Sequence, residues 1–207
     1  AVGYALDLSC VHDGWRSPEN YEHLCYTDIT PLYGARGFAD GVLPYLQHTP
    51  DGQYLEYPVL TGAFMQTSSW ITTLAAHVID GANRASVFFH VNVLGLFLAF
   101  LVTVIATALT VKRRPWDAAM VAVAPTMILA ATINWDLLPL AFSGLALLLW
   151  SRSKPFPAGL LLGLAVAAKF YPIVFLGAFL LLSLRTGRWR AFGALLGGTA
   201  VSWLIVN

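Results

Sequence analysis

The 207-residue chain contains 57% hydrophobic and 11% charged residues, and its mean hydropathy is +0.67. A soluble domain carries about 25% charged residues, so this composition excludes an ordinary soluble globular protein. Charges are rare in membrane-spanning chains because each one at the bilayer centre costs several kcal/mol. We therefore predict an all-α, polytopic helical membrane protein.

The net charge of +1 hides two regions of opposite sign. Residues 1–56 contain eight acids and two bases, whereas residues 57–207 contain three acids and ten bases. No basic patch is interleaved with aromatic residues, so nucleic acid is not expected as a partner. The split indicates an acidic polar segment followed by apolar helices with basic connecting loops.

The first part of the chain is expected to lie mostly outside the membrane. We expect residues 1–7 to form the end of a first membrane helix and residues 8–86 to form a large extracytoplasmic loop. Within the loop we expect a short helix over Pro31–Gly37, with Thr30 as its N-cap. We also expect Val59–Val78 to form a helix that lies at the membrane interface. Seven polar residues lower the hydrophobicity of this stretch, and a membrane span there would reverse the sidedness of every later loop.

Residues 87–207 are expected to form a bundle of membrane helices with basic loops. Short loops rich in Lys and Arg stay in the cytoplasm by the positive-inside rule. Three such clusters occur, namely Lys112–Arg114, Arg152 with Lys154, and Arg185 with Arg188 and Arg190. Placing all three in the cytoplasm puts the acidic loop on the extracytoplasmic side of the plasma membrane.

The membrane helices are predicted from the apolar runs between these clusters. Val87–Val111 has about 25 residues, against the roughly 20 that a bilayer requires. Ala118–Ile133 and Leu137–Trp150 are expected as two shorter spans. Residues 157–184 are expected to form either one tilted helix or a hairpin. The hairpin is favoured for two reasons: Pro172 disrupts helical geometry, and a hairpin keeps both flanking basic clusters on the same side of the membrane.

A last helix is expected from Ala191 to the end of the sequence. Its unfinished apolar run and the shortness of the first helix predict that the sequence is a fragment of a longer protein. Cys10 and Cys25 are the only cysteines, and both lie in the acidic segment. An oxidising compartment favours a disulfide between them, worth about 3 kcal/mol for such a loop, and two free buried thiols are the alternative.

Several charged residues are candidates for chemistry. Asp28 precedes the expected short helix, and a partly dehydrated carboxylate at the membrane edge suits a general base; a plain loop acid is the alternative. Lys169 stands among apolar residues, where it can bind a lipid phosphate or only snorkel to the interface. Arg36 and Arg84 can also bind a phosphate, or they can contact headgroups or nearby acids.

Other polar residues have simpler explanations. Asp136 suits a charge at a helix N-terminus at least as well as a site. His90 near the outer end of its helix suits interfacial packing better than a ligand role. The five His residues show no close spacing, so no metal site is expected. The Gly-rich Lys-Ser/Thr loop that cradles nucleotide phosphates does not occur in the sequence.

Three stretches of the sequence carry a family resemblance. The first is Asp28-Ile29-x-x-Leu32-Tyr33, followed by Arg36-Gly37, Gly41, Pro44-Tyr45 and Glu56-Tyr57-Pro58. The others are Asn134-Trp135-Asp136-Leu137-Leu138, and Gly159–Leu164 leading into Ala168-Lys169-Phe170-Tyr171-Pro172. In this order they resemble membrane glycosyltransferases of the GT-C fold, and most closely the actinobacterial glycosyltransferase family 87. The resemblance covers nearly the whole chain, as the N-terminal half of a family member.

The resemblance implies a transferase that uses a polyprenyl-phosphate sugar, with mannose as the expected sugar, at the outer face of the membrane. Asp28 would deprotonate the acceptor hydroxyl. Basic side chains would hold the donor phosphate as it leaves, namely Lys169, Arg84 and Arg36. Further site candidates are Asp136, Tyr57 and His90.

The resemblance also implies the molecules that the protein meets. The lipid-linked sugar is a substrate, so no cofactor is expected, and the acceptor is a lipid or a glycan surrounded by membrane lipids. The alternative hypothesis is a non-enzymatic subunit of the same fold that binds lipid or a membrane-protein partner. A transporter is a weaker third hypothesis, because the spans carry almost no charge to line a pathway.

Overall fold

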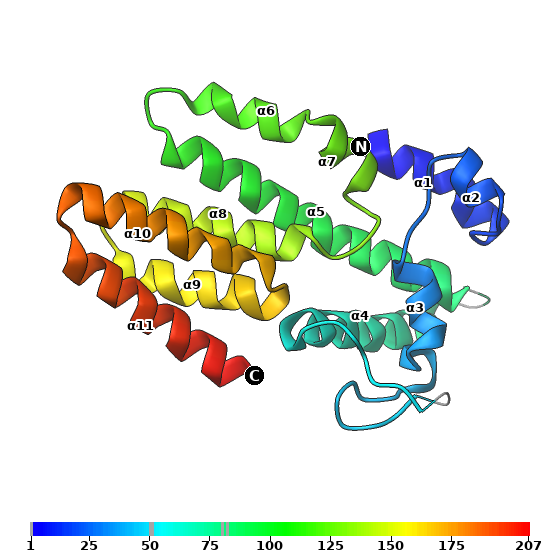
Figure 1. Cartoon of the computed structure of the whole chain (residues 1–207). Helices are drawn as coiled ribbons and strands as arrows, with labels where there is room; N and C mark the ends of the chain where they lie inside the picture. Colours follow the sequence, from blue (N-terminus) through cyan, green and yellow to red (C-terminus); the bar gives the residue numbers. More distant parts are fainter. Residues whose placement is uncertain (1, 50–51, 80, 82) are drawn as a thin grey trace. The chain divides into compact units, whose positions relative to one another are not determined.

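The computed structural model describes residues 2–49, 52–79, 81 and 83–207, apart from the side chains of His12 and Asp13. Residues 50, 51, 80 and 82 of the expected outer loop lie outside this description. Across the described residues all regular secondary structure is helical, so the all-α prediction is confirmed (Figure 1). The chain divides into unit 1, residues 1–56, 62–97 and 123–135, and unit 2, residues 57–61, 98–122 and 136–207.

Unit 1 is built from short helices and parts of two long ones. Its helices are α1 (Val2–Asp13), α2 (Glu19–Glu22), α3 (Ile29–Ala35), the 3-10 turn η1 (Phe38–Asp40), α7 (Pro125–Ala130), most of α4 (Val59–Val78) and the first part of α5 (Arg84–Thr110). Helix α4 has the bounds that the sequence predicted. Helix α1 ends at Asp13 rather than at residue 7, so the helical segment reaches into the expected loop.

The core of unit 1 fixes the loop that carries Asp28. Cys10 and Cys25 form the predicted disulfide, with their Cα atoms 6.2 Å apart. The Tyr33 ring of α3 stacks on Phe88 of α5 with centroids 4.4 Å apart. Both links are buried, so the segment before α3 is tied to α1 and α3 is held against the start of α5.

The single helix predicted over Ala118–Ile133 is wrong. The chain forms two short helices there, α6 (Ala118–Ala122) and α7, separated at residues 123–124. Pro125 explains the break, since it lacks an amide hydrogen and forces the residue before it out of helical geometry. Ala124 accordingly has φ −58° and ψ 131°.

Unit 2 contains four apolar helices around one core. They are α8 (Leu137–Ser151), α9 (Pro155–Ala168), α10 (Phe175–Thr186) and α11 (Trp189–Val206), with the 3-10 turns η2 (Pro115–Asp117) and η3 (Tyr171–Val174) and with α6. The core contains one or two buried residues of each apolar helix, such as Ala146, Leu162, Phe179 and Leu195. The predicted hairpin is confirmed, because the chain breaks after α9 and resumes as α10 beyond the turn that contains Pro172.

Small residues allow α9 and α11 to pack closely. A Cβ atom on Gly163 would overlap the backbone of Thr199, and one on Gly159 would overlap the backbone of Leu195. Gly159 and Gly163 are four residues apart and so lie on one face of α9, the small-xxx-small spacing that brings membrane helices into contact. Backbone contact between these helices therefore depends on both glycines.

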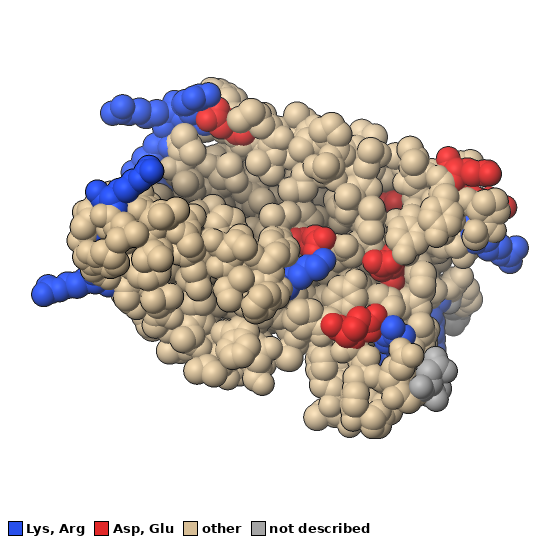
Figure 2. Space-filling model, viewed as in Figure 1, with Lys and Arg blue, Asp and Glu red and all other residues tan. Residues whose placement is uncertain are grey.

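The basic turns of unit 2 lie at one end of its helices. Arg152 after α8 donates to the Leu109 carbonyl near the end of α5 at 3.3 Å. Arg188 before α11 donates to the Ser153 hydroxyl at 3.4 Å. These contacts bring all three Lys and Arg clusters together, and Figure 2 shows the basic side chains gathered over this end of unit 2.

Two helices among the described residues are long and apolar enough to cross a membrane, α5 with 27 residues and α11 with 18. Helices α8 and α9 and the η3–α10 segment are apolar but shorter. With 15 residues, α8 is about 22 Å long, which is below the roughly 30 Å hydrocarbon thickness of a bilayer. A membrane around these helices would have to be thinned locally.

Candidate active site

The backbone around Asp28 in unit 1 is held by the chain that follows α7. The Asp28 amide donates to the Ile133 carbonyl at 2.8 Å, and the Thr27 hydroxyl donates to the Thr132 carbonyl at 2.7 Å. Asp28 stands at the N-cap position of α3, two residues before the predicted Thr30 cap. The helix starts early because the Thr27 hydroxyl accepts the Ile29 amide at 3.2 Å.

The Asp28 carboxylate is half-buried and accepts a hydrogen bond from a phenol. The Tyr26 hydroxyl donates to Asp28 Oδ1 at 2.7 Å. This bond is the main cause that raises the pKa of Tyr26 above its ordinary value of 10.0, so Tyr26 stays a neutral donor near pH 7. Tyr26 was not predicted from the sequence. A signal was present, because Tyr26 and Asp28 are two residues apart and such residues lie on the same side of an extended segment.

Tyr26 also lines an open pocket of about 220 Å³ in unit 1. The residues around it are Asn20, Tyr21, Leu24, Tyr26, Leu129 and Ile133. A single side chain thus belongs both to this pocket and to the hydrogen bond of Asp28.

Arg36, a proposed phosphate-binding residue, forms a bidentate ion pair with Glu56. Its Nε and Nη2 atoms donate to the two carboxylate oxygens at 2.6 Å and 3.0 Å. These bonds hold the pKa of Glu56 below its ordinary value, with the Arg36 hydrogen bond as the largest cause. A phosphate that binds Arg36 would have to compete with Glu56.

Arg84 and His90 differ in exposure. Arg84 is the first residue of α5 and its side chain is exposed. Burial raises the pKa of Tyr33, and the charge of Arg84 acts on that phenol in the opposite direction. The His90 ring is half-buried, with its Nδ1 atom 3.3 Å from the Tyr4 hydroxyl. That contact is consistent with a packing role for His90.

Unit 2 contains an ion pair that the sequence did not predict. Lys169, just after α9, donates to Asp136, just before α8. Both side chains remain partly exposed, at 36% for Lys169 and 44% for Asp136. The adjacent Ala168 carbonyl accepts a buried hydrogen bond from the Thr61 hydroxyl at 2.6 Å. The end of α9 is therefore fixed, while Lys169 can still be reached from solvent.

The ion pair lies at the end of the α8–α9 hairpin opposite its basic turn, since Asp136 precedes the first helix and Lys169 follows the second. An ammonium group has three donors, and Asp136 occupies one of them. Lys169 can thus bind a phosphate oxygen and keep Asp136 as a partner. Tyr57, a further candidate, is half-buried in unit 2 just before α4.

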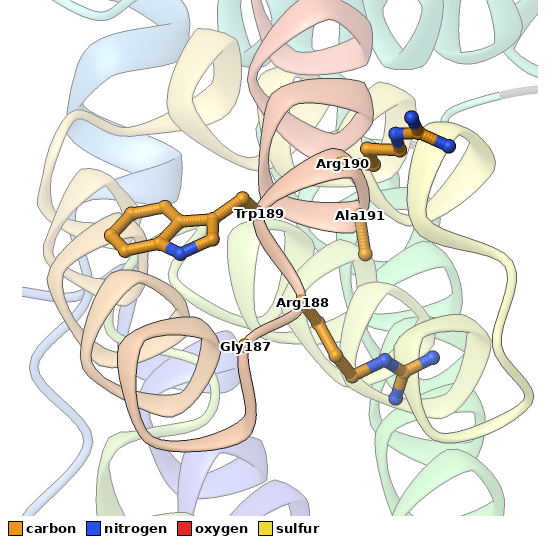
Figure 3. Close-up of a pocket in the computed structure, with 5 residues that line it drawn as sticks. All are labelled: Gly187, Arg188, Trp189, Arg190 and Ala191. Atoms are coloured by element: carbon orange, nitrogen blue, oxygen red, sulfur yellow. The ribbon is translucent and has the colours of Figure 1, made fainter.

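A second hollow of about 470 Å³ in unit 2 lies along residues 187–191 in the α10–α11 turn. Arg188 and Arg190 project to one side there, and Trp189 points away from them (Figure 3). This hollow is at the basic end and contains neither an acid nor a His, so it offers no general base. In the part of the chain that the structure describes, no cluster of His, Cys, Asp and Glu could hold a metal ion.

A family model decides the class of the protein. The model described as Glycosyltransferase family 87 matches residues 54–207, which is most of the chain. The chain belongs to glycosyltransferase family 87. Members of this family are membrane proteins, and membership implies glycosyltransferase activity with a sugar donor and an acceptor. Comparisons with curated proteins and with solved structures gave no match.

The family 87 match divides the site candidates. It includes five of them, namely Tyr57, Arg84, His90, Asp136 and Lys169, and it begins after Asp28 and Arg36. The resemblance was expected over nearly the whole chain, whereas the family model matches residues 54–207. The assignment of Asp28 as a base consequently depends on its own sequence run and surroundings.

Proposed function

We propose that this family 87 chain transfers a sugar from a polyprenyl-phosphate donor to a lipid or glycan acceptor at the extracytoplasmic face, with mannose as the sugar. The observation that carries the proposal is the family match over residues 54–207. Two groups with complementary chemistry support it: the carboxylate of Asp28 and the partly exposed ammonium of Lys169. A glycosyl transfer needs one to accept a proton and the other to stabilise a departing phosphate.

Asp28 acts as the general base in this proposal. As the acceptor oxygen attacks the anomeric carbon, its proton passes to the Asp28 carboxylate, and the bond from that carbon to the donor phosphate breaks. The electron pair of the broken bond leaves with the polyprenyl phosphate. Asp28 suits the task because it forms no ion pair with a described Lys or Arg, and Tyr26 is a neutral donor.

Lys169 is the proposed main contact of the donor phosphate, with Arg84 and Arg36 as further contacts. Arg84 is the more available arginine, because its side chain is exposed and Arg36 already holds Glu56. A cation placed before the reaction costs no reorganisation when negative charge develops on the leaving group.

The test of Asp28 is the Asp28→Asn variant, assayed in membranes with a polyprenyl-phosphate sugar. We expect kcat to fall about 10²–10⁴-fold, as for loss of a general base, with an unchanged KM for the donor. Asp40→Asn is the control, since Asp40 is an exposed acid of the same unit. Undiminished transfer by the Asp28 variant would remove this residue as the base.

The proposed sidedness follows from the shared end of the three basic clusters. Its test uses one introduced cysteine at a time and an impermeant thiol reagent. Ser153→Cys, in the exposed basic turn, should react only in inside-out vesicles. Leu46→Cys in unit 1, at a side chain that is 80% exposed, should react only in right-side-out vesicles. Labelling of both positions from the same side would contradict the topology.

A further inference from the structure

The lining of the pocket beside Asp28 includes two exposed aromatic rings. The Tyr21 and Tyr26 rings stack with centroids 5.6 Å apart and an angle of 15° between their planes. Tyr21 is 60% exposed and Tyr26 is 40% exposed. The face of an aromatic ring is apolar and electron-rich, so it favours contact with groups that carry partial positive charge, such as the C–H groups of a sugar ring.

The lining of the pocket also includes an amide side chain, that of Asn20. An amide can donate to and accept from a sugar hydroxyl, whereas an acyl chain offers it no hydrogen bond. The side-chain oxygen of Asn20 is buried without a hydrogen-bond partner among the described residues, and a buried acceptor of this kind is costly.

The size of the pocket limits the ligand. Its volume of about 220 Å³ is below the roughly 300–1,000 Å³ of sites that hold drug-sized molecules. One six-membered sugar ring is therefore a better match than an oligosaccharide. Leu24, Leu129 and Ile133 add apolar side chains to the lining.

From these features we infer that the pocket binds the terminal pyranose ring of the glycosyl acceptor. Tyr26 connects the pocket to the reaction, because its ring lines the pocket and its hydroxyl is bonded to the Asp28 carboxylate. The inference rests on the proposed function for the identity of the ligand as an acceptor. It assigns Tyr21 and Asn20 to acceptor binding and makes the acceptor a glycan or glycolipid with an exposed hexose.

The test measures binding without turnover. The purified chain, in a detergent without a sugar headgroup, is titrated with methyl α-mannoside, methyl α-glucoside and methyl β-galactoside by saturation-transfer NMR. Tyr21→Ala should raise the Kd of the hexoside that binds most tightly about three- to tenfold, as expected for loss of one aromatic contact. Tyr21→Phe keeps the ring and should stay within about twofold of the wild type.

A matched control is Tyr54→Ala. Tyr54 is another exposed tyrosine of unit 1, at 53% exposure, and its ring contacts His48 rather than the pocket. Its removal should leave the hexoside Kd unchanged. The control separates a specific contact from a general loss of surface aromatic residues.

The outcomes distinguish this inference from the proposed function. Hexoside binding that depends on Tyr21 would support the pocket even if Asp28→Asn kept full transfer activity. Sugar transfer by the wild type, together with hexoside binding that Tyr21→Ala leaves unchanged, would overturn the pocket alone. Failure of all three hexosides to bind would also overturn the pocket as a sugar site. Tyr21-dependent binding of hexanoate in their place would overturn it by showing that the pocket is an acyl-chain site.

Discussion

Asp28 in unit 1 and Asp136 in unit 2 occupy equivalent local positions but have different partners. Each stands immediately before a helix, α3 or α8, and neither side chain makes a capping hydrogen bond. Asp28 accepts from the neutral Tyr26 hydroxyl, whereas Asp136 accepts from the Lys169 ammonium. The difference shows that the partner, rather than the position on the helix, decides what each acid can do.

An ion-paired carboxylate is a poor proton acceptor, because protonation would cancel its attraction to the ammonium. Asp136 is better placed to orient Lys169 than to act as a base. Asp28 loses no ion pair when it takes a proton. The comparison therefore supports the proposed role of Asp28 as the base, and it favours Asp136 as a residue that positions the proposed phosphate-binding cation.

Of the variants that test the Lys169–Asp136 pair, Lys169→Met should have the larger effect. Loss of a cation that stabilises the departing phosphate should lower kcat/KM for the lipid-linked donor about 10²–10³-fold. Lys169→Arg should retain part of the activity, since it keeps the charge. Lys154→Met is the control, because Lys154 is exposed in the basic turn at the other end of the hairpin. Equal losses for Lys169→Met and Lys154→Met would contradict a specific role for Lys169.

A smaller effect, about tenfold in kcat/KM, is expected for Asp136→Asn. The asparagine keeps the shape of the side chain but holds the ammonium less firmly. The deciding measurement is a double-mutant cycle with Lys169→Met, in which the Asp136 substitution should have little further effect. Independent, additive losses would instead indicate that Asp136 acts on the reaction by itself.

The sequence predicted the helices whose signals are local. The long apolar run of α5 ends at a basic cluster, and Pro172 marks the break between α9 and α10. The single helix over residues 118–133 was predicted wrongly because its hydropathy was considered without Pro125, which prevents Ala124 from adopting helical geometry. The same rule that located the hairpin would have located this break.

The Lys169–Asp136 pair shows why the candidate site was harder to predict. The two residues are 33 positions apart, and neither has a local signal for the other. The available clue was that α8 and α9 have nearly equal lengths, 15 and 14 residues. In a hairpin of equal helices, the residue before the first lies beside the residue after the second. Tyr26 was missed for a different reason, since an acid near a tyrosine is common in loops.

Glu56 extends the comparison to a third carboxylate, which is paired with Arg36 and is half-exposed. The pKa of Glu56 is lowered from 4.5, mainly by the Arg36 hydrogen bond. Because the folded pKa is the lower one, the pair stabilises the fold above pH 4.5 and this contribution is lost as the pH falls through the folded pKa. The effect should stay below about 1 kcal/mol, since solvent screens an exposed pair.

Thermal unfolding in detergent between pH 3 and pH 7 measures this contribution. The wild type should be slightly more stable than Glu56→Gln near pH 7, and the two should converge as the pH falls through the lowered pKa of Glu56, where the carboxyl takes up its proton. Glu22→Gln is the matched control, because Glu22 is an exposed acid of the same unit that has no ion pair with a described residue. A difference between wild type and Glu56→Gln that did not change with pH would mean that Glu56 stabilises unit 1 through packing, and Arg36 would then be more available to a phosphate than its ion pair indicates.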